Sequence, residues 1–199
     1  MNQPIAPSHV DLGAGAWLDH EPHWLDPRAA ESLFAQLLLE LAWEQRAIVV
    51  FGRPVLQPRL IAWAGEPPYR YSGQTLEPRA FTPGVAALLD PVSARAGAAF
   101  NHVLVNRYRD GADHLGLHAD AEPELGPDPV VATLSLGESR RFVVKPRRRS
   151  AGPGRDYRLE SGSLLVMGGT CQRHFVHGVP REAGARGERI SLTFRTLLR

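Results

Sequence analysis

Apolar residues recur at helical spacing in one segment near the beginning of the chain. They share one side of a helix with about 3.6 residues per turn, and they are Leu33, Phe34, Leu37, Leu38 and Leu41. Asp26 stands where an N-cap side chain accepts hydrogen bonds from the first turn, and Pro27 suits the first helical position. We therefore predict a helix that begins directly after Asp26.

A second helix is predicted to begin at Thr82 and Pro83, because Val85, Leu88 and Leu89 follow at helical spacing. Pro91 is expected to end or kink it, since proline lacks the backbone N–H that a helix interior needs. Both helices precede most of the β-rich sequence, so we expect them to form an N-terminal helical layer.

Short apolar segments separated by turn residues dominate the rest of the chain. We predict strands over Phe100–Tyr108, Val130–Leu136, Arg141–Lys145, Ser163–Met167, His174–Val176 and Arg189–Leu197. Earlier strand-like segments are Ala47–Phe51, Leu60–Trp63 and Tyr69–Tyr71. Many short strands favour a sandwich or barrel, so the expected fold class is α+β, with helices packed on a mainly antiparallel β core.

Composition limits the class of protein. The 199 residues are 43% hydrophobic and 22% charged, which suits one globular domain over residues 1–199. A single Cys excludes an intramolecular disulfide framework and a zinc site of several Cys. We see no secretory signal and no long apolar run, so we expect no membrane association and a reduced, bacterial cytoplasmic setting. The net charge of +2 is too small to name a partner.

His118 and Asp120 form a His-x-Asp motif. On a strand, residues i and i+2 point to the same face, so an imidazole and a carboxylate would lie side by side. His177 is the best third ligand, and the set would match the two-His, one-carboxylate site of non-haem Fe(II) oxygenases, which leaves open positions for a co-substrate and O₂. Alone the motif is weak evidence, since it occurs by chance.

Residues 189–195 supply the second feature. In strand register Ile190, Leu192 and Phe194 share one face, and the opposite face carries Arg189, Ser191, Thr193 and Arg195. The polar face either is solvated or lines a cavity. In a cavity, two guanidiniums would suit a ligand with a carboxylate at each end, such as 2-oxoglutarate. Asn106 and Tyr108 also share a strand face and either donate hydrogen bonds to that diacid or pack in the core.

These residues resemble the AlkB family of Fe(II)/2-oxoglutarate dioxygenases, which repair alkylated nucleic acid. The motifs occur in the family's order from about residue 48 to residue 198: Asn106-x-Tyr108, His118-x-Asp120, His177 and Arg189-x5-Arg195. The resemblance implies a double-stranded β-helix (jelly-roll) core over residues 100–199 and a nucleotide-recognition lid over residues 46–80. It leaves residues 1–25 as an N-terminal extension.

The resemblance also implies the site and the reaction. His118, Asp120 and His177 would hold Fe(II), and the residues that would bind 2-oxoglutarate are Asn106, Tyr108, Arg189, Ser191 and Arg195. Ser191 departs from the Asn of many members. The implied reaction is oxidative demethylation of bases such as N1-methyladenine and N3-methylcytosine with Fe(II), 2-oxoglutarate and O₂, releasing formaldehyde, succinate and CO₂ without a separate acid or base residue.

Substrate contacts follow the same resemblance. Glu122 matches an acid near the exocyclic amine of the base. Tyr71 could stack on a flipped base, and Tyr69 could hydrogen-bond a backbone phosphate of the nucleic acid or the edge of the base. Ser72 belongs to the same Tyr-x-Tyr-Ser-Gly segment. The alternatives are a solvated loop acid and a Tyr pair that packs a sheet.

The hairpin around Phe51 and Gly52 resembles one that duplex-preferring members insert into DNA, with Phe51 filling the gap left by the flipped base. Arg59 matches the same subgroup, so the expected partner is alkylated, double-stranded DNA and the expected state is a monomer. A buried Phe51 is the simpler alternative. The other open readings are the same chemistry on single-stranded nucleic acid, RNA or protein, and a non-enzymatic metal-containing binding module.

Overall fold

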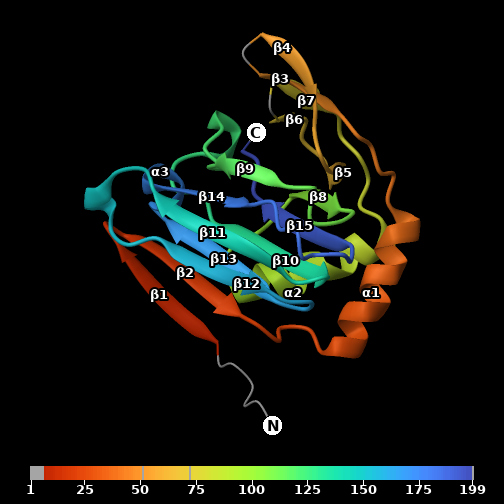
Figure 1. Ribbon diagram of the computed structural model, residues 1–199, viewed down its shortest axis with the longest axis horizontal. Coiled ribbons are helices and arrows are strands. Elements are labelled where there is room, and N and C mark those ends of the chain that lie inside the picture. The colour runs from red at the N-terminus through yellow and green to blue at the C-terminus, as the bar shows by residue number, and fades with distance from the viewer. Residues whose placement is uncertain (1–6, 51, 72, 199) are drawn as a thin grey trace.

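A computed structural model describes residues 7–50, 52–71 and 73–198. Two antiparallel sheets form its centre (Figure 1). In spatial order the seven-stranded sheet contains β1 (Ser8–Gly13), β2 (Ala16–Glu21), β13 (Leu164–Gly169), β10 (Val131–Gly137), β15 (Arg189–Arg195), β8 (His102–Tyr108) and β5 (Leu60–Gly65). The four-stranded sheet contains β12 (Arg155–Leu159), β11 (Arg140–Pro146), β14 (Phe175–Val179) and β9 (Leu115–His118).

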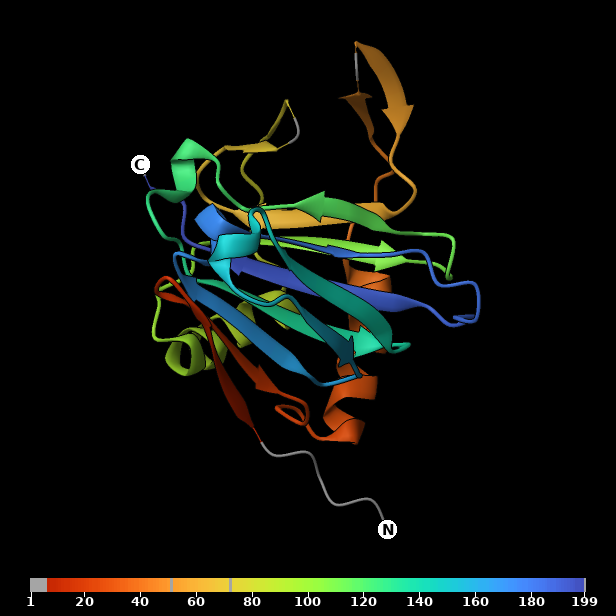
Figure 2. The same cartoon turned by 60° about the vertical axis from the view of Figure 1, so that its left-hand side comes forward.

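Two small hairpins stand outside these sheets. One pairs β3 (Ala47–Val50) with β4 (Arg53–Leu56), and the other pairs β6 (Tyr69–Tyr71) with β7 (Gln74–Leu76). Figure 2 shows both hairpins projecting from the same side of the molecule, next to β9. They fall within the segment expected as a lid, although β5 lies between them in sequence and belongs to the large sheet.

The first predicted helix is confirmed as α1 (Pro27–Glu40). Asp26 caps it through its Oδ1, which accepts hydrogen bonds from the backbone N–H groups of Arg28 and Ala29 at 3.0 Å. Leu37 is fully buried, and neighbouring apolar residues of the stripe are partly buried against the same core. The cap and the apolar stripe are both local features, so the sequence located this helix well.

The second helix, α2 (Pro83–Ala96), runs through Pro91 and is longer than expected. Pro91 is exposed, and the residue whose carbonyl loses its helical partner, Ala87, is exposed too. Water can therefore satisfy that carbonyl. Val92, directly after the proline, is fully buried and continues the contact with the core. Of the two outcomes expected at Pro91, an end of the helix does not occur, because the carbonyl that loses its hydrogen bond faces solvent.

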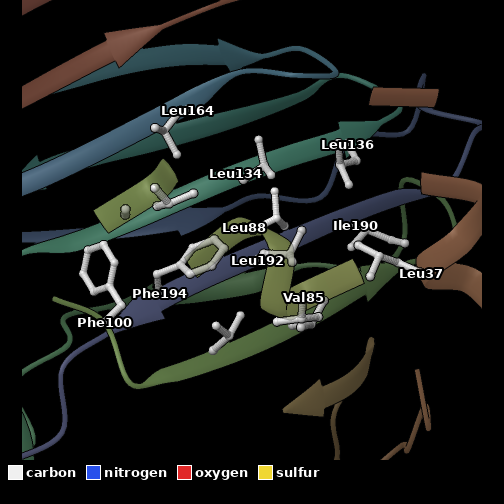
Figure 3. Close-up of a cluster of buried hydrophobic side chains, with 14 of the residues drawn as sticks. Leu37, Val85, Leu88, Phe100, Leu134, Leu136, Leu164, Ile190, Leu192 and Phe194 are labelled. Atoms are coloured by element: carbon white, nitrogen blue, oxygen red, sulfur yellow. The ribbon is translucent and has the colours of Figure 1, made fainter. Parts of the chain in front are cut away.

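The large sheet has apolar packing on both faces. Figure 3 shows side chains of α1, α2 and the sheet meeting on one face, among them Leu37, Val85, Leu134 and Leu192. A second cluster lies between the two sheets and includes Tyr108, Phe142 and Phe175. The order of layers is therefore helices, large sheet, small sheet, which is the jelly-roll architecture expected from the sequence.

Strand alternation in β15 decides where the polar residues go. Ile190, Leu192 and Phe194 belong to the cluster beneath the helices. Arg189 and Arg195, on the opposite face, are also buried, so this face is not solvated. It lies between the sheets, and the polar side chains are enclosed there.

Not every strand was foreseen. The predicted strands are found with shifts of a few residues at their ends, but β1, β2, β4, β7 and β12 were not assigned, and β9 was anticipated only as a strand that would carry His118 and Asp120. β1 and β2 come from the segment expected as an N-terminal extension, and β2 pairs with β13 as part of the large sheet. Three short helical turns complete the chain: α3 (Cys171–His174) and the 3-10 turns Pro123–Leu125 and Arg149–Ala151. Among the described residues, no helix combines the length and apolarity that crossing a bilayer requires.

Candidate metal centre and co-substrate cavity

His118 and His177 face one another across the small sheet. They are paired directly in the β9–β14 register, and their ring centroids lie 4.4 Å apart. The Nδ1 atom of His118 contacts the backbone carbonyl of Gly116 at 3.0 Å, which leaves Nε2 as its available ligand atom. The ring of His177 stacks on Phe142 at 5.5 Å between centroids, which fixes its orientation.

Asp120 completes the group from a loop. β9 ends at His118, so Asp120 lies beyond the strand, and the expectation that both share one strand face was wrong in this detail. The carboxylate still reaches the histidines, and its Oδ2 lies 3.6 Å from Nε2 of His177. One ligand atom from each of the three residues lies within 4.8 Å of the others.

The charge of Asp120 is stabilised by its surroundings. Burial alone would raise the pKa of Asp120, but Arg195 with the two histidines outweighs burial and lowers it to about 2. Nη2 of Arg195 donates to Oδ1 at 2.6 Å. Oδ2 is buried and accepts no hydrogen bond from the described residues. The carboxylate is thus ionised and keeps one oxygen for a ligand.

The neighbouring groups have protonation states that suit metal binding. Burial, aided by the charge of His118, lowers the pKa of His177 to about 3, although Asp120 acts in the opposite direction. His177 is therefore neutral at pH 7 and can donate a lone pair. Burial and the nearby Asp120 raise the pKa of the Cys171 thiol to about 12, so this thiol stays protonated.

The three residues fit a divalent iron ion. Two neutral imidazoles and one carboxylate are the donor set of non-haem Fe(II) sites. The buried Oδ2 of Asp120, which the described residues leave without a donor, is the atom that a cation would satisfy. The site residues identified from the sequence, His118, Asp120 and His177, are the same three that the fold brings together.

A small cavity adjoins this group between the sheets. Most of its polar lining comes from alternate residues of two neighbouring strands, Asn106 and Tyr108 of β8 and Ser191, Thr193 and Arg195 of β15, and Thr133 of β10 adds a hydroxyl. The β8–β15 register sets Ser191 opposite Asn106. His118 and His177 line the same cavity, so a ligand inside it would lie beside the three candidate metal ligands.

Arg189 lies behind Tyr108 and does not line this cavity. Its guanidinium carbon is 5.2 Å from the centre of the Tyr108 ring, and its Nη2 donates to Oγ of Ser135 at 2.8 Å. No carboxylate forms an ion pair with Arg189 within the described ranges, and its Nε and Nη1 lack hydrogen-bond partners there. Burial lowers the pKa of Arg189. A buried guanidinium of this kind is available to an anionic ligand.

Arg59 contacts Asn106, which lines this cavity. It is buried, and its Nε donates to Oδ1 of Asn106 at 2.6 Å. Because the amide oxygen is engaged, the amide NH₂ group of Asn106 is the part left to contact a ligand. Sequence reasoning placed Arg59 among the substrate contacts, and the structure adds this contact with Asn106.

Tyr69 and Glu122 lie close to the metal ligands. Tyr69 is fully buried, with its ring 4.9 Å from that of His102 and 5.7 Å from the guanidinium carbon of Arg195. Burial, together with the charges of Asp120 and Glu122, raises the pKa of Tyr69 against the opposing effect of Arg195. Tyr69 therefore keeps its proton and can act as a donor to Glu122.

A wider groove opens on the other side of His118. It lies between the β3–β4 hairpin and β9. Its lining includes Glu122 and Arg59 with the exposed apolar side chains of Val55, Leu56 and Leu117. The groove shares His118 with the metal group, so a molecule in it would reach that group.

The structure describes only some of the residues predicted to contact the substrate. Gly52 is exposed in the β3–β4 turn with a φ of +77°, a conformation that favours glycine. Tyr71 is the last residue of β6, and the structure describes its backbone but not its side chain. Phe51 and Ser72 fall outside the described residues altogether.

Comparison with known proteins agrees with the geometry of the candidate metal site. The sequence profile of the 2OG-Fe(II) oxygenase superfamily matches residues 18–195. The chain is 36% identical over 180 residues to the human DNA oxidative demethylase ALKBH2, covering 85% of this chain and 69% of that protein. This chain belongs to the AlkB family of 2OG-Fe(II) oxygenases. The family membership accounts for the convergence of two histidines and a carboxylate beside an arginine-lined cavity.

Other relatives agree with this placement. The AlkB-family chain is 34% identical over 224 residues to DNA oxidative demethylase ALKBH2 of Arabidopsis thaliana, covering 97% of this chain and 71% of the relative. It is 38% identical over 185 residues to alpha-ketoglutarate-dependent dioxygenase alkB homolog 3 of Bos taurus, covering 88% of this chain and 64% of that protein. The chain thus spans less than two thirds of the length of the Bos taurus protein. A solved structure, OsALKBH1, shares the fold with a TM-score of 0.64 at 19% identity, covering 95% of this chain and 100% of that one.

Two buried residues of the site were missed by sequence analysis. Gln172 of α3 accepts a hydrogen bond from the backbone of Asp120. Arg140 of β11 donates to the carbonyls of Asp110, Asp113 and Pro180, which ties two loops at one end of the sheets. Neither residue belongs to a local pattern. Their partners lie at least 27 residues away in sequence, so only the fold identifies them.

Proposed function

We propose that this protein is an oxidative demethylase that removes N-methyl groups from bases such as N1-methyladenine and N3-methylcytosine in DNA. The observation that carries the proposal is the convergence of His118, Asp120 and His177 beside an enclosed cavity lined by Asn106 and Arg195. The relatives named as DNA oxidative demethylases support it. Bound iron, with 2-oxoglutarate and O₂, would supply oxidation of the methyl group, with release of formaldehyde, succinate and CO₂.

The protein's own residues would hold the metal and orient the diacid. His118, Asp120 and His177 are the metal ligands in this proposal. Arg195 neutralises Asp120 and lines the cavity, so it suits the carboxylate of 2-oxoglutarate nearest the metal. Asn106, Tyr108 and Ser191 offer further hydrogen-bond donors in the same cavity, and Arg189 supplies positive charge from behind Tyr108.

Glu122 and Tyr69 would recognise the base. N1-methyladenine and N3-methylcytosine are cationic, so a carboxylate near the metal favours them over neutral bases. Glu122 lines the groove that His118 shares, and Tyr69 adjoins Glu122 from the buried side. In this proposal the groove is where a nucleotide that has left the base stack enters.

Double-stranded DNA is the substrate that we favour. The β3–β4 hairpin projects from the molecule (Figure 2) beside the groove. The apolar side chains of Val55 and Leu56 are exposed on it. In this proposal Phe51, at the hairpin turn, fills the space that the flipped base leaves, and Tyr71 stacks on that base. The hairpin thereby offsets part of the cost of unstacking. Action as a monomer, in the cytoplasm, completes the proposal.

The test is formaldehyde release from oligonucleotides that carry one N1-methyladenine or N3-methylcytosine. We expect release that requires Fe(II) and 2-oxoglutarate, is abolished by His177→Gln and is unchanged by the surface control His9→Gln. Phe51→Ala is expected to lower the rate on duplexes more than on single strands. Equal losses on both would remove the case for a duplex substrate, and no release from any methylated nucleic acid would refute the demethylase itself.

A further inference from the structure

Gln172 connects the short helix α3 to the loop that carries Asp120. Its side chain is 1% exposed, and its Oε1 accepts a hydrogen bond from the backbone N–H of Asp120 at 3.0 Å. The two residues are 52 positions apart in sequence. At the other end of the amide, Nε2 lies 3.9 Å from Sδ of Met167, a weak acceptor. The amide is therefore oriented, with its oxygen toward Asp120.

The loop needs such an anchor because the strand ends before it. β9 pairs with β14 as far as His118, and Asp120 lies two residues beyond the last pair. Arg195 holds Oδ1 of the carboxylate, but one bond to a side-chain oxygen does not fix the backbone. The bond from the Asp120 N–H to Gln172 fixes the backbone, so the two contacts together direct Oδ2 toward His177.

The amide also suits the charge of the site. Asp120 and Arg195 form a buried ion pair, and a cation is expected beside them. Gln172 adds an acceptor without adding a charge, so it holds the loop without altering the balance between the carboxylate and its partners. A buried N–H left without an acceptor is costly, which makes this contact strong enough to determine the loop's position.

We propose that Gln172 is a positioning residue for the metal ligand Asp120: it holds the backbone of this residue so that the carboxylate is directed at the metal before the metal binds. This inference rests on the proposed function, because it assumes that His118, Asp120 and His177 bind a divalent metal. Groups that orient metal ligands typically contribute roughly 10- to 100-fold to metal affinity.

The experiment measures Co(II) affinity of the full chain by calorimetry, without any substrate turnover. Gln172→Leu removes the acceptor and should weaken Co(II) binding roughly 10- to 100-fold. Gln172→Glu retains an oxygen that accepts the Asp120 N–H and should bind Co(II) more tightly than Gln172→Leu. Gln172→Met keeps the unbranched shape without the acceptor and replaces the leucine variant if that one does not fold.

Met167→Leu is the matched control. It changes the packing at the other end of the same amide but leaves the bond to Asp120 in place, so Co(II) affinity should remain native. Native affinity in Gln172→Leu or Gln172→Met, or an equal loss in Gln172→Glu or Met167→Leu, would overturn the inference, since packing alone would then explain Gln172. Failure of the native protein to bind Co(II) would instead refute the proposed function.

Discussion

Arg195 and Asp120 form a fully enclosed ion pair, in which Nη2 of the arginine donates to Oδ1 of the aspartate at 2.6 Å. Both side chains are at most 3% exposed. A buried ion pair stabilises the folded state little more than an apolar pair of similar size would, but removal of one partner leaves an uncompensated buried charge. The stability of the metal-free protein therefore depends on the two residues together rather than on either one.

Arg195→Met is expected to lower the free energy of unfolding by about 3–5 kcal/mol at pH 7, because Asp120 remains ionised without a partner. Urea unfolding measures this loss. The double variant Arg195→Met/Asp120→Asn should recover much of it. Arg141→Met breaks the exposed pair with Asp156 and should change stability by less than about 1 kcal/mol, so equal losses in the two arginine variants would contradict the prediction.

The stability of the metal-free protein should fall as the pH drops from about 6.5 to about 3. Burial lowers the pKa of both His177 and His102 to about 3, so the folded state keeps them neutral while the unfolded state protonates them. The unfolded state then binds more protons throughout this window. Asp120, with a folded pKa of about 2, adds to the same trend in a lower window, because its stabilisation is present above pH ~4 and is lost as the pH falls toward 2.

Urea unfolding between pH 7.5 and 4.5 tests this dependence. His102→Phe keeps an aromatic ring beside Tyr69 and removes one titrating group, so the slope against pH should decrease by up to about 1.4 kcal/mol per pH unit. A native slope in His102→Phe would show that His102 is protonated in the folded state.

Arg189→Met should separate binding from stability. Arg189 is buried without a carboxylate partner among the described residues, so its removal should leave the stability of the ligand-free protein equal or higher. Affinity of the Co(II)-loaded protein for 2-oxoglutarate should fall by up to about tenfold, because Arg189 contributes a positive charge from behind Tyr108 and does not line the cavity. Calorimetry measures both changes against Arg107→Met, which removes an ion pair with Glu188 and should leave 2-oxoglutarate affinity unchanged.

Alanine substitutions at two glycines, Gly111 and Gly116, test how closely the backbone packs at each position. A Cβ atom on Gly111 would lie 1.8 Å from the backbone carbonyl oxygen of Glu182, so Gly111→Ala must separate the two loops that Arg140 ties together. We expect a loss of about 2 kcal/mol or more. A Cβ on Gly116 of β9 meets nothing within 4 Å, so Gly116→Ala should be within about 0.5 kcal/mol of native. Thermal unfolding compares them, and similar melting temperatures would contradict the close approach at Gly111.

Local patterns predicted the elements that depend on local physics. The cap at Asp26 and the apolar stripe through Leu37 located α1, and alternation along residues 189–195 separated the face under the helices from the polar face. The same reasoning failed where a neighbour decides the outcome. Pro91 lies inside α2 because its face is exposed while Val92 is buried, a fact that depends on how the helix docks on the sheet.

The sequence by itself determined which residues could form the metal group and which face of β15 carries the arginines, because residue type and strand period suffice for both. Only the tertiary structure decided that Asp120 leaves the strand, that Gln172 holds its backbone, and that Arg59 engages Asn106. These contacts join residues 47 to 52 positions apart. The spacing of residues within one segment carries no information about such contacts, since the packing of distant segments brings their atoms together.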